Sequence, residues 1–133
     1  MNEDFVTIEI AKKLHENGFN EPCINAINPY GCTYLNGWCE YLDNRDGEHI
    51  TQKDLKEGCY LLPTISQVLK WLRNEKKLHI EVMFIRPLHN RVKYYITDTD
   101  GSRGDFMDVS DEHYETWEQA TLAGIEYVLN KLI

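Results

Sequence analysis

Apolar residues recur at intervals of three and four positions near the start of the chain, which predicts an amphipathic helix. The apolar stripe consists of Phe5, Ile8 and Ala11, together with Ile10 and Leu14. Gly18 follows the stripe, and glycine readily takes the left-handed conformation that ends a helix. We therefore expect the helix to stop at Gly18 and the next residue, Phe19, to fold back on the stripe.

Two further helices are indicated by the residues of their first turns. Thr64 and Gln67 have the spacing of a capping box, and Thr116 and Gln119 repeat it near the end of the chain. The apolar side of the last helix is expected to contain Trp117, Ala120, Val128 and Leu132. Gly124 lies inside this helix, where glycine costs about 1 kcal/mol relative to alanine. A glycine there indicates close packing against another element, which we expect to be a sheet.

Alternation of apolar and polar residues predicts a β-hairpin between the second and third helices. Leu78, Ile80, Val82 and Phe84 share one side of the first strand. A turn at 87–90 leads to a second strand in which Val92, Tyr94 and Ile96 alternate with polar residues. Residues 105–109 are expected to add a short third strand.

The segment from residue 20 to residue 59 has a different pattern. Proline and glycine interrupt it repeatedly, which argues against a long helix. Strand-type residues occur at 33–35 and 38–42, and residues 44–47 have the composition of a hairpin turn. The elements together predict the α+β class: three helices packed on a small antiparallel sheet, in the order helix, irregular strands, helix, β-hairpin, helix. With 133 residues we expect a single domain, 1–133.

Three stretches of the chain resemble small uncharacterised proteins encoded in prophages and other mobile elements. They are 11–23, beginning Ala11-Lys12-Lys13-Leu14, then 62–82, beginning Leu62-Pro63-Thr64, and 114–125, beginning Tyr114-Glu115-Thr116-Trp117. That family has no established reaction, so the resemblance supplies no catalytic residue. It implies a phage-associated accessory role or an interaction with host proteins.

Composition and charge are those of a soluble domain. Hydrophobic residues make up 42% of the chain, and the formal net charge is −8. The first residues are acidic and lack the basic and apolar regions of a secretory signal, and no apolar run reaches the roughly 18–20 residues of a membrane span. We therefore expect a cytoplasmic protein that does not enter a membrane.

Positive charge is concentrated in one segment of this acidic chain. Seven basic residues and only two acidic ones lie between Lys70 and Lys93. Trp71 lies within the segment, and Tyr94 and Tyr95 follow it. Basic side chains beside exposed aromatic rings could bind a phosphate backbone and stack bases. The alternative is a solvated helix end and a hairpin edge protected by its charges.

A second group of aromatic residues lies in the glycine-rich central segment. It includes Tyr34, Trp38 and Tyr41. Rigid aromatic rings beside glycine and asparagine are typical of recognition surfaces. The alternative is that these rings fill the core beneath long loops.

Cysteine and histidine spacing offers little support for catalysis. The cysteines are Cys23, Cys32, Cys39 and Cys59, and none forms a C-x-x-C pair. We expect reduced, buried thiols. A zinc site made by all four, a Cys23–Cys32 disulfide, and a nucleophilic pair of Cys39 or Cys59 with His49 remain alternatives. We expect no cofactor, no metal ion and no catalytic residue.

The sequence therefore predicts a non-enzymatic accessory protein, associated with a phage or mobile element, that acts by binding a protein partner. The alternative is a nucleic-acid or nucleotide binder that uses the basic hairpin 70–93. An exposed hairpin edge would also allow a homodimer. The candidate binding residues are Trp38, Tyr41, Tyr34, Arg73, Lys77, Arg91, Lys93 and Tyr95.

Overall fold

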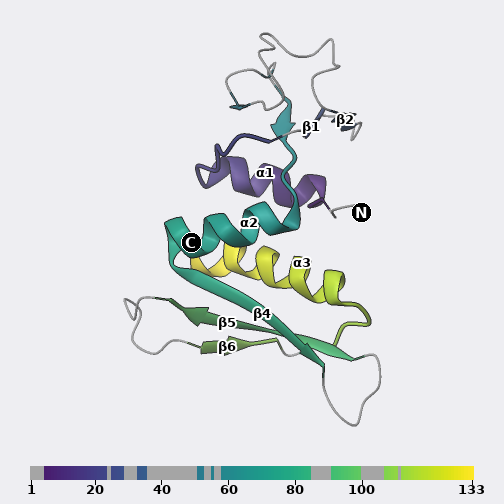
Figure 1. The fold of residues 1–133 in the computed structure, drawn as a ribbon, viewed down its shortest axis with the longest axis vertical. Coiled ribbons are helices and arrows are strands. Elements are labelled where there is room, and N and C mark those ends of the chain that lie inside the picture. The colour runs from purple at the N-terminus through teal and green to yellow at the C-terminus, as the bar shows by residue number, and fades with distance from the viewer. Residues whose placement is uncertain are drawn as a thin grey trace. The chain divides into compact units, whose positions relative to one another are not determined.

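The computed structural model describes residues 5–23, 25–28, 33–35, 51–52, 55, 58–84, 91–99, 107–110 and 112–133. The chain divides into two compact units, Met1–Thr64 and Ile65–Ile133. Helices and antiparallel strands are both present, so the predicted α+β class is confirmed (Figure 1). The strands form two three-stranded sheets, one in each unit, instead of the one small sheet expected. The expectation of a single domain stays a prediction.

The first unit begins with helix α1, Ile8–Glu16. The helix starts later than the apolar stripe suggested, because the hydroxyl of Thr7 accepts a hydrogen bond from the N–H of Ile10 at 3.3 Å and caps it there. Phe5 lies outside the helix, in an isolated antiparallel bridge with Thr64.

The end of α1 agrees with the prediction. Gly18 has a φ of 88°, and the N–H of Phe19 donates to the carbonyl of Leu14 at 2.9 Å. Phe19 is buried, so the chain does fold back at this point.

The sheet of the first unit consists of β1 (Asn25–Ile27), β2 (Thr33–Leu35) and β3 (Tyr60–Leu61). The strand order is β2-β1-β3, and both pairs are antiparallel. The strand predicted at 33–35 is confirmed. The strand predicted at 38–42 and the turn predicted at 44–47 lie outside the described residues.

The second unit alternates helical and extended segments. They are α2 (Ile65–Trp71), the π-helical turn η2 (Leu72–Lys76), β4 (Leu78–Phe84), β5 (Val92–Asp98), β6 (Met107–Val109), α3 (Trp117–Tyr127) and the π-helical turn η3 (Val128–Leu132). The sheet has the order β4-β5-β6, with antiparallel pairs throughout. In the described part of the chain, no helix is long and apolar enough to cross a membrane.

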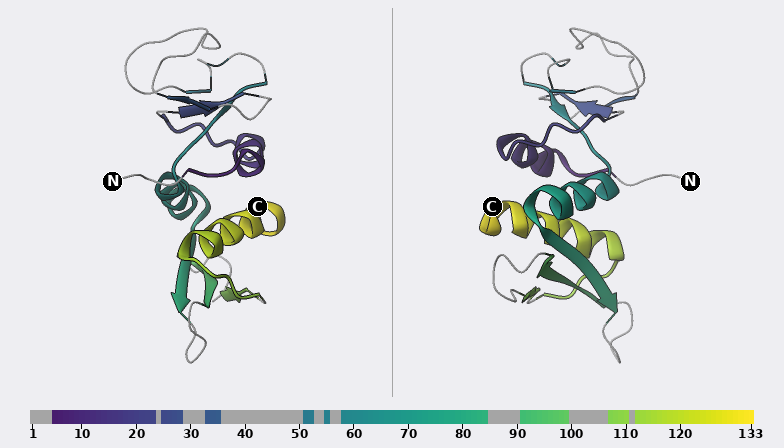
Figure 2. Two further views of the ribbon diagram at one scale, coloured as in Figure 1. Left: turned by 90° about the vertical axis from the view of Figure 1, so that its right-hand side faces the viewer. Right: turned by 60° about the vertical axis from the view of Figure 1, so that its left-hand side comes forward.

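Helix α3 lies across one face of this sheet and contacts β4 and β5 (Figure 2). Its first turn is capped as predicted, with the N–H of Gln119 donating to the hydroxyl of Thr116 at 3.1 Å. Gly124 faces the sheet, where an added Cβ atom would lie 3.0 Å from Ile80. The prediction that Gly124 permits close packing against a sheet is confirmed.

A short bridge connects the segment before α3 to the start of β5. Val92 and Tyr114 exchange two backbone hydrogen bonds, each of 2.8 Å. The ring of Tyr114 stacks on Tyr94 at a centroid distance of 6.2 Å, and Tyr127 of α3 packs on the same ring at 6.1 Å. The chain that enters α3 is therefore tied to the sheet.

Candidate functional site

Strand β4 forms one edge of the β4-β5-β6 sheet, and the register shows which of its backbone groups face outward. The N–H of Thr99 donates to the carbonyl of Lys77 at 2.9 Å, and Leu78 pairs with Asp98. Hydrogen-bonded and non-hydrogen-bonded pairs alternate along an antiparallel ladder. The odd-numbered residues of β4 therefore bond to β5, and the N–H and C=O groups of Ile80 and Val82 point away from the sheet.

The other side of β5 gives the same result independently. The N–H of Ser110 donates to the carbonyl of Tyr94 at 3.1 Å. The even-numbered residues of β5 therefore face β6, which leaves its odd-numbered residues to face β4. Tyr95 pairs with Glu81, so both pairings assign the same residues of β4 to the ladder.

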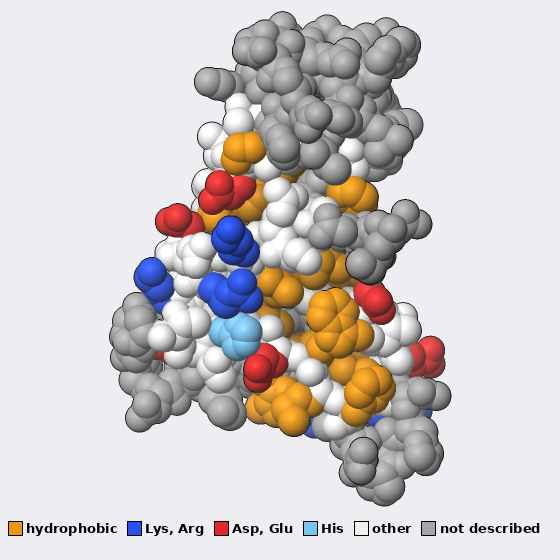
Figure 3. Space-filling model, in the orientation of Figure 1, with side chains coloured by type: hydrophobic (Ala, Val, Ile, Leu, Met, Phe, Trp, Pro, Cys, Tyr) orange, Lys and Arg blue, Asp and Glu red, His pale blue; other side chains and the backbone are white. Residues whose placement is uncertain are grey.

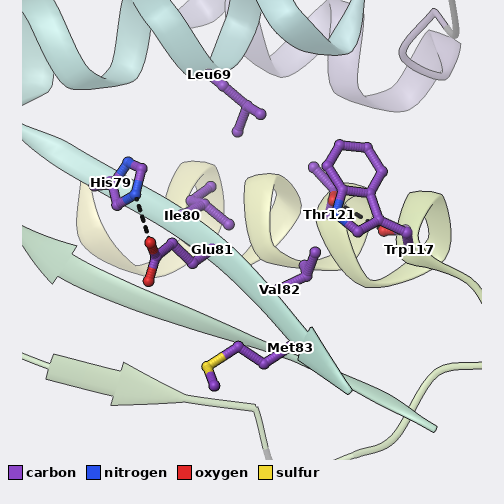
Figure 4. A pocket seen from close by; sticks show the side chains of 8 residues that line it. All are labelled: Leu69, His79, Ile80, Glu81, Val82, Met83, Trp117 and Thr121. Carbon is purple, nitrogen blue, oxygen red and sulfur yellow. Dashed lines mark hydrogen bonds and ion pairs between the residues drawn. The ribbon is translucent and has the colours of Figure 1, made fainter.

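A groove of about 540 Å³ runs beside this edge of β4 (Figure 4). It is lined on the strand side by residues 79–83, and on the helix side by Leu69 of α2 with Trp117 and Thr121 of α3. The hydroxyl of Thr121 donates to the carbonyl of Trp117 at 2.9 Å, so its hydrogen bond is satisfied within the helix. The helix wall offers the groove mainly apolar surface.

Three large apolar side chains are exposed at or next to this groove: Met83 and Trp117 line it, and Phe84 follows Met83 at the end of β4. Met83 is 53% exposed, Phe84 is 68% exposed, and Trp117 is 46% exposed. Figure 3 shows hydrophobic side chains gathered on this face of the molecule. We call Met83, Phe84 and Trp117 the apolar patch. Large exposed apolar surface marks interaction sites on soluble proteins.

Basic residues precede the strand that lines the groove. Lys70, Arg73 and Lys77 are exposed on the helical segment that leads into β4. His79, the next residue along the groove, has its Nε2 atom 3.4 Å from Oε1 of Glu81. Glu81 is 61% exposed, so this contact is well solvated and contributes little to stability. We call Lys70, Arg73 and Lys77 the basic end.

The predicted basic residues do not form one continuous patch. Arg73 and Lys77 precede β4, whereas Arg91 precedes β5, whose first residue pairs with Phe84 at the opposite end of β4. Lys93 pairs with Met83 and is half-buried. The hairpin thus places the two halves of the basic segment at opposite ends of the strand.

Two of the three aromatic residues expected to stack on bases are buried. Trp71 is 6% exposed and Tyr94 is 7% exposed. The amino group of Lys76 lies 5.3 Å from the centroid of the Trp71 ring and covers it. Tyr95 is half-buried and lies opposite Glu81.

The aromatic residues of the central segment are largely outside the described residues. This is the case for Trp38 and Tyr41, and for Tyr34 the structure describes only a place in β2. The interpretation of these three residues as a recognition surface stays a prediction.

Two of the four cysteines are described, and both are buried outside any disulfide. A disulfide between Cys23 and Cys32 is therefore not present. The thiol of Cys23 donates to the carbonyl of Glu21 at 3.3 Å. Burial, helped by the charge of Glu21, raises the pKa of Cys23 to about 12. A thiol that keeps its proton at neutral pH is a poor nucleophile and a poor metal ligand.

A metal site is not formed within the ranges that the structure describes, where no three His, Cys, Asp or Glu side chains come together. Cys32, Cys39 and His49 lie outside those ranges, so the alternatives that depend on them stay predictions.

The apolar patch is the feature that the sequence reasoning missed. The pattern predicted Phe84 and Trp117 on buried faces, and the structure exposes both. One signal was available: Met83 and Phe84 continue an apolar run past the point where strict alternation ends.

Comparisons of this chain with protein-family models, with curated proteins and with solved structures find no match.

Proposed function

We propose that this protein acts by binding another protein, as a non-enzymatic accessory factor. The observation that carries the proposal is the apolar patch beside the open edge of β4. Met83, Phe84 and Trp117 together expose more apolar side-chain surface than any other described part of the second unit. Their burial against a partner would remove that surface from water, which is the main driving force of protein association.

The groove suits a polypeptide better than a small molecule. Pockets for small ligands enclose most of the ligand surface. Here the residues at the rim are about half exposed, so a small molecule would stay largely in contact with water. An extended chain could instead contact the full length of the seven-residue strand.

The resemblance of three stretches to mobile-element proteins supports an accessory role. An accessory role of this kind would be exercised on the machinery of a host or of a phage, and binding is the simplest means of doing so. On this proposal the partner is a host or phage protein that presents apolar side chains to the patch.

Affinity capture from a lysate of the native host tests the proposed function. The tagged wild-type protein is compared with a patch variant that combines Phe84→Ala and Trp117→Ala. We expect the patch variant to retain about tenfold less of the captured protein, because exposed aromatic residues dominate interface energies. Val109→Ala is the matched control, since Val109 is an exposed apolar residue on the opposite edge strand, β6.

Equal capture by the wild-type protein and the patch variant would contradict the proposed site. A variant with Trp38→Ala and Tyr41→Ala distinguishes the apolar patch from the aromatic residues of the central segment as the binding surface. Loss of the partner in that variant alone would move the binding site to the central segment.

Nucleic-acid binding is a second candidate, supported by the exposed side chains of Arg73 and Lys77. Each phosphate contact should make the affinity fall as the salt concentration rises. A plot of the logarithm of the binding constant against the logarithm of the salt concentration should have a negative slope of about one per contact. We expect Arg73→Glu with Lys77→Glu to reduce the magnitude of that slope by about two in a titration with labelled DNA. A wild-type protein whose binding shows no salt dependence would exclude this candidate.

A further inference from the structure

We propose that the outer edge of β4, which pairs with no other described strand, binds an extended segment of the partner protein as an additional β-strand. We infer further that this segment carries acidic residues at one end and alternating apolar residues at the other. The inference rests on the proposed function and specifies the chemistry of the partner.

The first support is the backbone of β4. The N–H and C=O groups of Ile80 and Val82 point away from β5, and β4 is the outer strand of the described sheet. Such a row of groups is a template for another strand. Natural edge strands are commonly blocked by proline, lysine or a bulge. Residues 78–84 contain no proline, lysine or arginine, have Glu81 as their one acidic residue, and pair with β5 in continuous register.

The second support is the wall beside the edge. Side chains of an added strand would point alternately to the two faces of the sheet. On the helix face they would meet Leu69 and Trp117, which line the groove. This arrangement favours an apolar side chain at every second position of the partner segment.

The third support is the distribution of charge along the groove. The exposed side chains of Lys70, Arg73 and Lys77 belong to the helical segment that leads to the first residue of β4, whereas Met83 and Phe84 end the strand. Acidic residues of the segment would lie beside the basic end, and apolar residues beside the patch. Such complementarity sets the orientation of a partner and raises its rate of association.

The same distribution argues against a second copy of this chain as the occupant. Antiparallel pairing of two β4 strands would place the basic end of each copy beside the apolar patch of the other. Parallel pairing would place the two basic ends together, where like charges repel. Each chain also has a formal net charge of −8, which opposes self-association.

A displayed library of random peptides of about nine residues, long enough to span a strand, provides the probe. The full-length protein selects peptides from the library, with selection against an unrelated protein. We expect enriched peptides to combine acidic residues with apolar residues at every second position. Affinities of the enriched peptides are then measured by fluorescence anisotropy.

Val82→Pro tests the role of the backbone. It removes an N–H that points away from β5, so the ladder within the sheet is retained. Val109→Pro is the matched control, because the bond from Ser110 to Tyr94 turns the N–H of Val109 away from β5 on the opposite edge. We expect Val82→Pro to weaken peptide binding about tenfold or more, through one lost hydrogen bond and the added ring. Val109→Pro should leave the affinity within about twofold.

Peptide N-methylation keeps the test decisive should Val82→Pro fail to fold. Methyl groups at alternate peptide nitrogens block either the set that faces β4 or the set that faces solvent. We expect one set to abolish binding and the other to leave it intact. Equal effects of the two sets would overturn strand addition.

The remaining outcomes are distinguishable. One outcome is that the patch variant loses peptide binding, Val82→Pro retains it, and the two sets of methylated peptides bind equally. This outcome would overturn strand addition and would be consistent with the proposed function. Absence of enriched peptides would also overturn strand addition, while the capture experiment would decide the proposed function separately. A dimer in sedimentation that Val82→Pro converts to a monomer would assign the edge to a second copy and overturn the inference.

Discussion

Residue 124 of α3 lies so close to Ile80 of β4 that an added Cβ atom would be 3.0 Å from the Cγ2 atom of Ile80. The same atom would be 3.2 Å from Cγ of Tyr94. Ile80 and Tyr94 are both buried, so moving either side chain would disturb its packing against its neighbours. Gly124 therefore sets the distance between the helix and the sheet.

We expect Gly124→Ala to destabilise the protein by about 1 kcal/mol. Alanine would gain about 1 kcal/mol in helix propensity. Overpacking in a buried contact costs about 1–3 kcal/mol and outweighs that gain. Urea unfolding measures the difference in the free energy of unfolding.

A double-mutant cycle with Ile80→Ala provides the control for this prediction. Ile80→Ala removes the methyl group that the new Cβ atom would meet. The two changes together should therefore cost less than the sum of the two separate costs. Strict additivity, or a stabilising Gly124→Ala, would show that α3 moves away freely.

The two left-handed residues at helix ends should respond in opposite ways to substitution. Lys77 has a φ of 59° and Gly18 has a φ of 88°. A left-handed conformation costs a residue with a side chain about 1–2 kcal/mol, which glycine avoids. We expect Lys77→Gly to stabilise the protein by about 0.5–1 kcal/mol and Gly18→Ala to destabilise it by about 1 kcal/mol. Thermal unfolding of both variants would refute this explanation if the two shifts had the same sign.

The tryptophans Trp71 and Trp117 should differ sharply in their contribution to stability. Trp71 is 6% exposed, so Trp71→Ala should cost about 3–5 kcal/mol. Trp117 is 46% exposed, and Trp117→Ala should cost about 1 kcal/mol or less. Iodide should quench the fluorescence of Trp117 and leave that of Trp71 nearly unchanged. A large loss of stability in Trp117→Ala would assign this residue to the core and undermine the proposed site.

Stability should fall at alkaline pH in a way that depends on Cys23. The folded thiol keeps its proton up to about pH 12, whereas the unfolded thiol loses it above its ordinary pKa of 9.0. The stability contributed by the protonated thiol is therefore fully present below pH 9 and is lost as the pH rises toward 12. We expect the wild-type protein to lose more free energy of unfolding than Cys23→Ala between about pH 8 and about pH 10. Identical pH profiles would contradict a buried, protonated thiol.

The elements of the second unit were largely predictable, because their signals are local. The bond between Thr116 and Gln119 follows from the spacing of a capping box, and the hairpin follows from alternation. The position of Gly124 indicated where the helix packs on the sheet, because glycine destabilises a helix interior and is favoured there only when close packing leaves no room for a side chain.

The candidate site was not predictable, because the exposure of a side chain depends on whether a neighbouring helix or strand extends far enough to cover it. Alternation assigned Phe84 to the same buried side as Ile80, yet Phe84 is 68% exposed at the end of the strand. The basic segment is continuous in sequence, but the hairpin places Lys77 and Arg91 at opposite ends of β4. The π-helical turn η2 was not predicted either, because its hydrogen-bond pattern depends on packing and not on the spacing of residues.

The paired hydrogen bonds between Val92 and Tyr114 have a consequence for the entropy of association with the proposed partner. They hold the chain that enters α3 against the sheet, three residues before Trp117. One wall of the groove is thus in place before a partner arrives, and little of its conformational entropy is left to lose. Most of the entropy lost on binding would then come from ordering the partner's segment. The flexibility of that segment, more than that of this protein, would therefore determine the affinity of the complex.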